Sequence, residues 1–244
     1  LEALAGAEAP PRAQAIRGIA LELERLACHI GDLGALAGDV GYLPTASFCG
    51  RIRGDFLNMT ALLSGNRFGR GLVVPGGAGF DVEPARVAEL GGRLDAGEKD
   101  ATTAIRLLFE NQSVLARFEE IGMLSAVDAV ALGLVGPAAR ASGLARDIRR
   151  DHPAGVFRAA RHECATCASG DVYARAHMRW LEIQQSLAFI RGQLRDLPEG
   201  PLAVTVGPLA PDAFAVALAE GWRGEVCHVA VTDAQGRLAR YKVV

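Results

Sequence analysis

The sequence contains no apolar segment long enough to cross a membrane as a helix. Its uncharged apolar stretches, such as residues 132–139, are far shorter than the roughly 20 residues that such a helix needs. It also has no surplus of charge of one sign, because 26 basic residues stand against 28 acidic ones, for a net charge of −2. A balanced chain has no overall field that attracts nucleic acid or an anionic membrane surface. We therefore predict no nucleic-acid partner and no direct membrane span.

Cysteine is scarce and irregularly spaced. Five cysteines form no paired framework of the kind found in small secreted proteins, so we expect a reducing, cytoplasmic location. Cys164 and Cys167 form a single CxxC shortly after His162, and the other cysteines supply no second pair for a four-ligand zinc site. The pair can therefore be interpreted as a metal-binding or redox dithiol or as two ordinary loop cysteines, and the second interpretation is the default. We predict no metal ligand in this chain.

Several catalytic signatures are missing as well. No GxGxxG or P-loop stands between a strand and a helix, and no GxSxG occurs, so nucleotide binding and serine-nucleophile chemistry have no support. The chain begins at Leu1 without a methionine and stops at Val244 within an alternating pattern. We expect residues 1–244 to be a single helical core domain that is a fragment of a longer subunit.

Apolar residues at helical spacing dominate what is present, and half of the chain is hydrophobic. The spacing predicts long helices from Pro11 to about Ala37, over about 47–63, from Pro84 to near Gly122, and from Asp171 to just before Pro198. A short helix capped by Ser125 should run through Leu134 and be terminated by Gly136-Pro137. Residues 64–79 read as a loop or short hairpin, and residues 226–231 and 238–244 read as a β-hairpin. The fold class is therefore mainly α with small β additions (α+β).

The first helix carries an unusual polar stripe. Glu22, Arg25, His29 and Asp32 are three or four residues apart, and Asp39 follows two turns later on the same side. Such a stripe is often a solvated face. Here small residues replace the Lys or Glu of a surface helix at Ala27, Gly31, Gly34 and Gly38. We therefore predict that Asp39 is enclosed and interacts with a polar or basic partner.

Arginines gather in a segment without helical spacing. Arg140-Ala-Ser-Gly143 precedes a charged run over residues 146–151, and Trp222-Arg223-Gly224-Glu225 precedes the hairpin. Each segment can be a solvated loop. Alternatively, the guanidinium groups pair with buried carboxylates or anionic groups in two places at once.

Five motifs, taken in order along the chain, resemble one family. They are Leu23-Glu24-Arg25-Leu26 with His29, Asp32 and Asp39; Gly65-Asn66-Arg67-Phe68 with Pro75-Gly76-Gly77; Gly136-Pro137 with Arg140-Ala141-Ser142-Gly143 and Asp147-Ile148-Arg149; Gly170-Asp171 with Arg175, Arg179, Glu182 and Ser186; and Arg223-Gly224-Glu225 with the hairpin. Together they resemble large subunits of energy-converting NiFe hydrogenases and the homologous 49 kDa subunit of respiratory complex I (NADH:quinone oxidoreductase). Details favour the formate hydrogenlyase and hydrogenase-4 branch, since Gly69 stands where the quinone branch has a histidine.

The resemblance implies a long-helix bundle of the NiFe-hydrogenase large-subunit type with a C-terminal β-hairpin. It implies catalytic roles for two residues: Asp39 matches an aspartate that pairs with the quinone-binding histidine, and Arg223 matches the arginine beside the NiFe centre. It also implies that His29, Arg140 and Arg149 lie near a partner subunit that carries an iron–sulfur cluster.

The function implied is transfer of electrons between an adjacent iron–sulfur subunit and H⁺/H₂. One alternative is a quinone-reactive 49 kDa-type subunit, and another is a non-catalytic scaffold. The family's nickel ligands are CxxC pairs upstream and downstream of this stretch, and Cys164 and Cys167 match neither. The chain itself is therefore expected to hold no cofactor and to be inactive alone, with a NiFe centre (or quinone) in the full-length subunit. Expected partners are an iron–sulfur small subunit and membrane subunits, which place it peripherally on the inner membrane.

Overall fold

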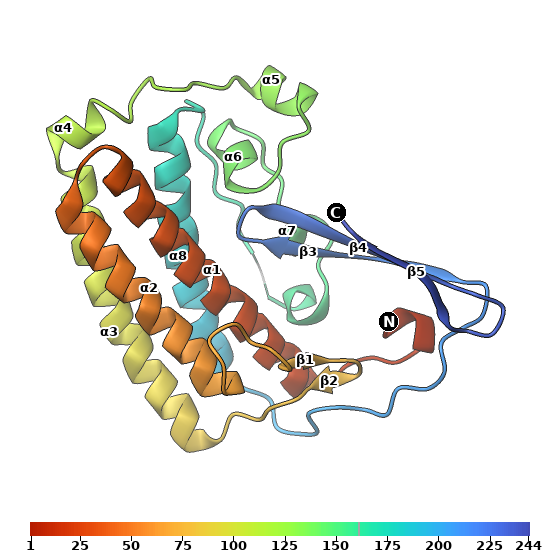
Figure 1. Ribbon diagram of the computed structural model, residues 1–244. Coiled ribbons are helices and arrows are strands. Elements are labelled where there is room, and N and C mark those ends of the chain that lie inside the picture. The colour runs from red at the N-terminus through yellow and green to blue at the C-terminus, as the bar shows by residue number, and fades with distance from the viewer. Residues whose placement is uncertain (161) are drawn as a thin grey trace.

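The computed structural model describes residues 1–160 and 162–244, which form long helices, several short ones and two small antiparallel sheets (Figure 1). The long helices are α1 (Pro11–Asp39), α2 (Leu43–Ser64), α3 (Pro84–Phe109) and α8 (Val172–Arg195). The short ones are η1 (Ala3–Ala5), α4 (Gln112–Leu115), α5 (Ala126–Ala131), α6 (Gly136–Ala141), α7 (Ile148–Asp151) and η2 (Gly155–Arg158). The strands are β1 (Val73–Val74), β2 (Gly77–Ala78), β3 (Phe214–Gly221), β4 (Gly224–Thr232) and β5 (Leu238–Val243). The combination of mostly helices with two small antiparallel sheets confirms the α+β class.

Helix α1 is the centre of the bundle, with α2 on one side and α8 on another, while α3 packs against α2 (Figure 1). Its apolar stripe, from Ile16 to Leu33, is fully buried, as predicted. Close packing on α2 depends on a glycine, because a Cβ on Gly34 would lie 2.7 Å from the Cβ of Cys49. Small residues on α1 thus let a second helix approach, so the prediction that this helix is enclosed is confirmed for this face.

Local signals set the helix boundaries. Pro11 occupies the first turn of α1, and the Asp171 carboxylate caps α8 by accepting a hydrogen bond from the Ala174 N–H at 2.8 Å. The third helix was predicted to continue to near Gly122, which is wrong. It ends at Phe109 because Asn111 starts a separate turn, its side chain accepting from the Ser113 N–H at 3.0 Å.

A second boundary also differs. Gly136-Pro137 does not end a helix but begins α6, with the proline in the first turn, where its missing N–H costs nothing. The arginine-rich segment, in which we saw no helical spacing, contains the end of α6 and the short helix α7.

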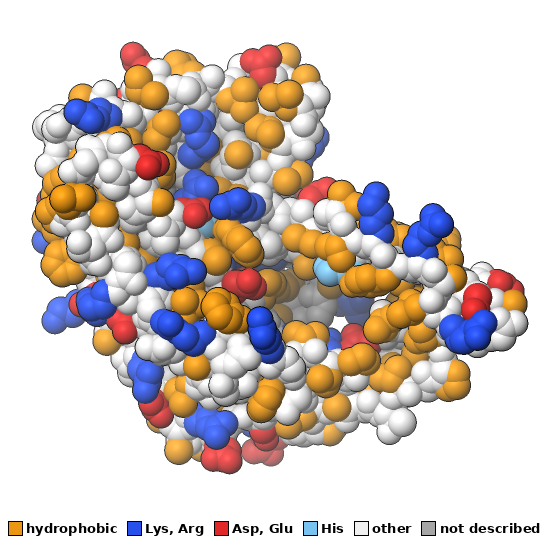
Figure 2. Space-filling view, in the orientation of Figure 1, with side chains coloured by type: hydrophobic (Ala, Val, Ile, Leu, Met, Phe, Trp, Pro, Cys, Tyr) orange, Lys and Arg blue, Asp and Glu red, His pale blue; other side chains and the backbone are white. Residues whose placement is uncertain are grey.

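The C-terminal strands form an antiparallel sheet in the order β3-β4-β5. The predicted hairpin is its β4–β5 pair, and β3 is an additional strand that sequence patterning missed, since its alanines give little contrast between the two faces. The sheet stands away from the bundle, and exposed apolar side chains such as Phe214, Val216, Tyr241 and Val243 follow it (Figure 2). The short pair β1–β2 confirms a hairpin within residues 64–79.

No helix among residues 1–160 and 162–244 is both long and apolar enough to span a bilayer.

Candidate active site

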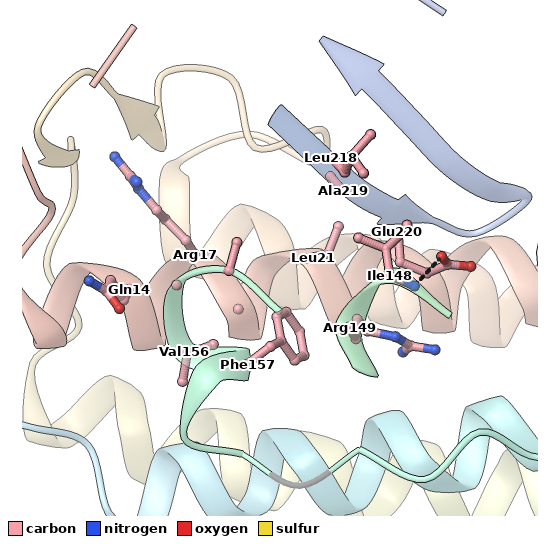
Figure 3. Close-up of a pocket in the computed structure, with 13 residues that line it drawn as sticks. Gln14, Arg17, Leu21, Ile148, Arg149, Val156, Phe157, Leu218, Ala219 and Glu220 are labelled. Atoms are coloured by element: carbon pink, nitrogen blue, oxygen red, sulfur yellow. Dashed lines mark hydrogen bonds between the residues drawn. The ribbon is translucent and has the colours of Figure 1, made fainter. Parts of the chain in front are cut away.

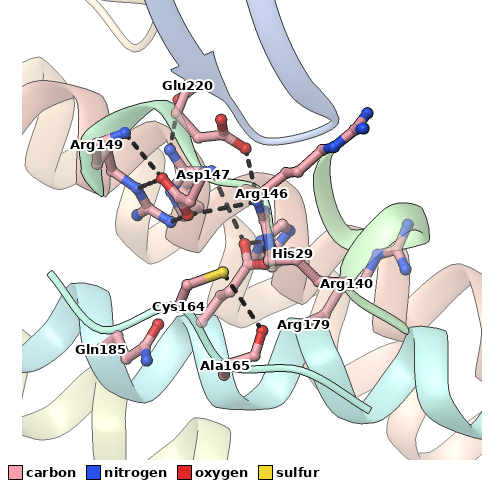
Figure 4. Close-up of polar contacts among 12 residues, drawn as sticks. His29, Arg140, Arg146, Asp147, Arg149, Cys164, Ala165, Arg179, Gln185 and Glu220 are labelled. Atoms are coloured by element: carbon pink, nitrogen blue, oxygen red, sulfur yellow. Dashed lines mark hydrogen bonds and ion pairs between the residues drawn. The ribbon is translucent and has the colours of Figure 1, made fainter. Parts of the chain in front are cut away.

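The polar stripe of α1 is buried against the rest of the fold. Glu22, Arg25 and His29 have at most 1% of their surface exposed, and they bind side chains of α7 and α8 and the backbone at the end of β3. Buried charges require partners, because an isolated charge in a low-dielectric interior is strongly destabilising. Figure 4 shows the partners converging from these segments, which lie far apart in the sequence. We call this set of side chains the ionic network: Glu22, Arg25, His29, Arg140, Asp147, His162, Arg149, Glu182, Ser186 and Glu220.

Glu182 of α8 is one centre of the ionic network. The Nε2 atom of His29 lies 2.7 Å from its Oε2, and the Nε of Arg140 donates to its Oε1 at 2.9 Å. The Nη2 of Arg140 lies 2.8 Å from the same oxygen without the alignment of a hydrogen bond. The Arg140 Nη1 donates to Oε1 of Glu220 at 2.9 Å, so this guanidinium joins a helix to the sheet (Figure 4).

Glu22 is the second centre. It accepts from Arg25 Nε at 3.1 Å, from Arg149 Nη1 at 3.1 Å and from the Ser186 hydroxyl at 2.6 Å. Arg149 in turn donates through Nη2 to Asp147 at 2.6 Å. The network therefore ties α1 to α7 and α8 by charge-assisted hydrogen bonds.

Electrostatics keep most of these carboxyl groups ionised. Burial by itself would raise the pKa of Glu22, but the charges of Arg25 and Arg149 outweigh it and lower this pKa to about 2. The pKa of Glu182 is also lowered, since the hydrogen bond from His29 and the nearby arginines outweigh burial. Burial lowers the pKa of His29, which favours its neutral form, and the hydrogen bond to Glu182 only partly opposes this.

Glu220 departs from this pattern. Burial, followed by the nearby carboxylate of Asp147, raises its pKa, and Arg140 only partly compensates. Among the network's carboxyl groups it is the one whose pKa is raised, while those of Glu22, Asp147 and Glu182 are lowered.

The structure brings together His29, Arg140 and Arg149, which the sequence predicted to lie near a partner subunit. Their exposed fractions are 0%, 1% and 3%. These side chains are buried and bind other groups of this chain, so none of them touches a partner directly, and proximity to a cluster stays a prediction.

Sequence reasoning did not select Glu182 and Glu220 as site residues. The available signal for Glu182 was its place, with Ser186 one turn later, on the apolar side of α8.

Asp39 is not enclosed, so that prediction is wrong. It is the last residue of α1, its side chain is exposed, and it has no hydrogen bond or ion pair within the described part of the chain. The physical reason is that the helix ends there and turns away at Gly41, whose φ is +75°. Its carboxylate is therefore free to meet a ligand or another chain.

Asp39 and Arg223 nevertheless line the same cavity, of about 500 Å³. We call it the Asp–Arg cavity, and its charged lining is Asp32, Asp39, Arg175, Arg179 and Arg223. Arg179 donates through Nε to Asp32 at 3.0 Å, and Arg175 donates to the Gly170 carbonyl at 2.6 Å. Two arginines are thus anchored at the wall of the cavity.

Two glycines position Arg223. A Cβ on Gly136 would lie 2.2 Å from the Arg223 carbonyl oxygen, and one on Gly224 would lie 2.5 Å from Val135. Both have positive φ angles, which glycine adopts without strain. The β3–β4 turn can therefore rest on the start of α6, with the exposed Arg223 at the cavity.

The donor set does not match a nickel–iron centre. Such a centre needs several thiolates, whereas the Asp–Arg cavity is lined by carboxylates and guanidinium groups. Cys164 and Cys167 are free, and burial raises the pKa of both thiols, which keeps them protonated. In the described part of the chain, no three His, Cys, Asp or Glu side chains are grouped so as to hold a metal ion. We assign no chemical step to a metal held by this chain.

The fold is that of a subunit of a respiratory membrane complex. One solved structure, the membrane-bound sulfane sulfur reductase of an archaeal respiratory membrane complex, contains a chain that matches 99% of this one and 67% of its own length, with a TM-score of 0.90 and 26% identity. The chain belongs to the family of the respiratory-chain NADH dehydrogenase 49 kDa subunit, whose sequence pattern matches residues 39–213. The predicted family is therefore confirmed.

Individual relatives fall in both branches. The chain is 36% identical over 243 residues to a carbon monoxide-induced hydrogenase of Rhodospirillum rubrum, covering 99% of this chain and 67% of the relative. It is 38% identical over 201 residues to an NADH-quinone oxidoreductase subunit of Chloroherpeton thalassium, covering 82% of this chain and 46% of the relative. The chain thus spans about two thirds of the hydrogenase and about half of the NADH-quinone oxidoreductase subunit.

Proposed function

We propose that this chain is the helical core of the large subunit of a membrane-associated oxidoreductase complex, and that the Asp–Arg cavity takes the species being reduced or oxidised. The observation that carries the proposal is the convergence of Asp39 and Arg223. They are far apart in the sequence, each matches a functional residue of the family, and both line one cavity.

The lining of this cavity suits proton and electron chemistry. Arg223 has no ion-pair partner within the described residues, and three arginines face two aspartates, which leaves a positive surplus. A guanidinium without a partner can stabilise negative charge as it develops on a substrate. A carboxylate such as Asp39, open to solvent at the end of α1, can accept or donate a proton.

We favour H⁺/H₂ as the substrate pair. The support is the match to the carbon monoxide-induced hydrogenase, which extends over 99% of this chain, whereas the match to the Chloroherpeton thalassium protein extends over 82%. The 49 kDa family pattern supports the second candidate, reduction of a quinone in the same cavity. In either case electrons come from an iron–sulfur small subunit, and membrane subunits hold the assembly peripherally on the cytoplasmic side of the inner membrane.

The test is made on the full-length subunit in its native complex. We expect H₂-dependent dye reduction, and expect Arg223→Lys to lower its kcat by roughly 10²–10³-fold while the complex assembles normally. A lysine keeps the charge but loses the planar fork that pairs with two atoms at once. Arg240→Lys, at an exposed arginine on β5, is the matched control and should retain full activity.

Three results are informative. Loss of H₂ activity in the Arg223 variant alone supports the hydrogenase reading. If the wild-type complex reduces quinone but shows no H₂ activity, and Arg223→Lys abolishes the quinone reduction, the second candidate is supported. Wild-type turnover in the Arg223 variant on both substrates would contradict the proposal.

A further inference from the structure

Glu220, at the end of β3, stands between two cavities. One, of about 270 Å³, is mostly apolar and lies between α1, η2 and β3, with Leu21, Phe157 and Leu218 in its wall (Figure 3). The other, of about 260 Å³, is polar and includes Asp151 and His152. Glu220 lines both. We call the second one the polar cavity, and it is large enough to hold several water molecules.

The Glu220 carboxyl group is nevertheless almost completely shielded, at 2% exposure. Its Oε1 accepts from Arg140 Nη1 at 2.9 Å, and its Oε2 accepts from the Ile148 N–H at 3.0 Å (Figures 3 and 4). Each oxygen keeps a second lone pair, so the group can carry a proton without losing either hydrogen bond.

Among the residues that the structure describes, the buried carboxyl groups of the ionic network outnumber its buried guanidinium groups by one. It contains four buried carboxyl groups, Glu22, Asp147, Glu182 and Glu220, and three buried guanidinium groups, Arg25, Arg140 and Arg149. With His29 in its neutral form, ionisation of all four acids would leave one buried carboxylate without a guanidinium of its own among these groups, which is strongly unfavourable. His162, which lies 3.2 Å from Asp147, stands beside that acid and not beside Glu220. A single proton on one of the four restores balance.

Glu220 is the acid with the weakest compensation. Glu22 has two arginines and a hydroxyl, and Glu182 has Arg140 and His29. Glu220 has only Arg140, which it shares with Glu182.

The groups that face Glu220 come from every element packed around it. Arg140 of α6, the Ile148 N–H of α7 and Arg25 of α1, which donates to the Glu220 backbone carbonyl, favour a negative charge nearby. The carboxylate of Asp147 opposes it, and burial raises the pKa of Glu220 further. Across the polar cavity, Glu225 of β4 and the exposed Arg146 carry opposite charges, and Asp151 and His152 complete the titratable lining.

We propose that Glu220 is a proton-exchanging group that holds the single mobile proton of the ionic network and exchanges it with water in the polar cavity. On release the O–H bond of Glu220 breaks and the proton passes to water. On uptake the reverse occurs, and no electrons move. Its coupling to the Asp–Arg cavity rests on the proposed function: the chain Glu220–Arg140–Glu182–His29 leads along α1 to Asp32 in the cavity wall, so charge that arrives there changes the proton occupancy of Glu220.

Infrared difference spectroscopy on the full-length complex tests the first part. At neutral pH the wild type should show the C=O stretch of a protonated carboxylic acid, which shifts in D₂O. Glu220→Gln should remove this band, while Glu119→Gln, at an exposed glutamate outside both cavities, should leave it unchanged. Absence of the band in the wild type, or its persistence in Glu220→Gln, would overturn the proposal. The wild-type measurement decides even if the Glu220→Gln variant fails to assemble.

Turnover against pH tests the coupling. Wild-type kcat should fall as pH rises through the pKa of Glu220, which gives the pH profile a descending limb. In Glu220→Gln this limb should be absent. At neutral pH the variant's kcat should be lowered roughly tenfold or more, with KM unchanged. Glu220→Asp, which keeps a carboxyl group, should restore part of the limb. An identical pH profile in wild type and Glu220→Gln would refute coupling. A carboxylic-acid band in a complex without H₂ or quinone activity would instead show that the proposed function fails while the proton site stands.

Discussion

Helix α1 is buried on two sides that are built in different ways. Toward α2 it is apolar and tight, with Gly34 placing the two helices in near backbone contact. Toward α6, α7 and α8 it carries Glu22, Arg25 and His29, which are equally buried but held by ion pairs. The apolar side gains stability through area removed from water, whereas the ionic side gains little net stability but fixes which residues meet. The two sides should therefore respond differently to substitution and to pH.

The largest effect is expected from breaking the ionic side. Arg140→Met leaves the carboxylates of Glu182 and Glu220 without their shared guanidinium, and we expect it to lower the free energy of unfolding by about 3–5 kcal/mol. Urea denaturation followed by circular dichroism measures this. Arg146→Met is the matched control, because that arginine is exposed, and it should change stability by no more than about 0.5 kcal/mol. Equal effects of the two substitutions would mean that the network does not hold α6 in place.

Lowering the pH should also destabilise the fold through the ionic side of α1. The folded pKa of Glu22 is about 2, against 4.5 for an unperturbed glutamate, so its ionised form stabilises the fold above the unfolded value. That contribution, about 3 kcal/mol, is lost as pH falls from about 4.5 toward 2. The lowered pKa values of Glu182 and Asp147 act in the same direction.

Urea midpoints measured through this pH range check the acid effect. Glu22→Gln should flatten the dependence, and Glu119→Gln, at an exposed glutamate, should not change it. A slope that is identical in wild type and Glu22→Gln would contradict the assignment.

The apolar side should give a smaller effect. Gly34→Ala places a methyl group 2.7 Å from the Cβ of Cys49, and we expect a loss of about 1–3 kcal/mol from overpacking. Gly38→Ala, one turn later on the same helix, meets nothing within 4 Å and should instead stabilise by about 0.5–1 kcal/mol through helix propensity. Thermal unfolding distinguishes opposite signs directly, and this effect should not depend on pH. Stabilisation by both substitutions would show that the α1–α2 contact is looser than described.

Much of the bundle could be predicted because its signals are local. The stripe of α1, Pro11 at its start and the Asp171 cap of α8 each depend on residues within a few positions of one another. The ionic network could not be paired in the same way, since Glu182 lies 153 residues from His29 and 42 from Arg140. Strand β3 was missed because its alanines reduce the contrast between alternate positions, and Glu220, which belongs to this strand, was missed as a site residue with it.

The predicted roles of Asp39 and Arg223 came from motif resemblance, and sequence could not reveal that Asp39 is exposed. Exposure at that point depends on where the helix ends relative to its neighbours, which is a property of the tertiary fold. Spacing on a helix indicates which residues share a side, but it does not indicate how far along the helix the neighbouring elements bury that side.

The contact between Gly136 and the β3–β4 turn has a mechanical consequence. Arg223 is carried by the sheet, while Asp39 and Arg179 are carried by the helices of the bundle. A small rigid-body rotation of the sheet about this glycine contact would change the distance between guanidinium and carboxylate, and it would also strain the contacts of Arg140 and Arg25 with Glu220 that fix the sheet to the bundle. The reactivity of the cavity could then be tuned by whatever binds the exposed strands, at a distance from the reacting groups.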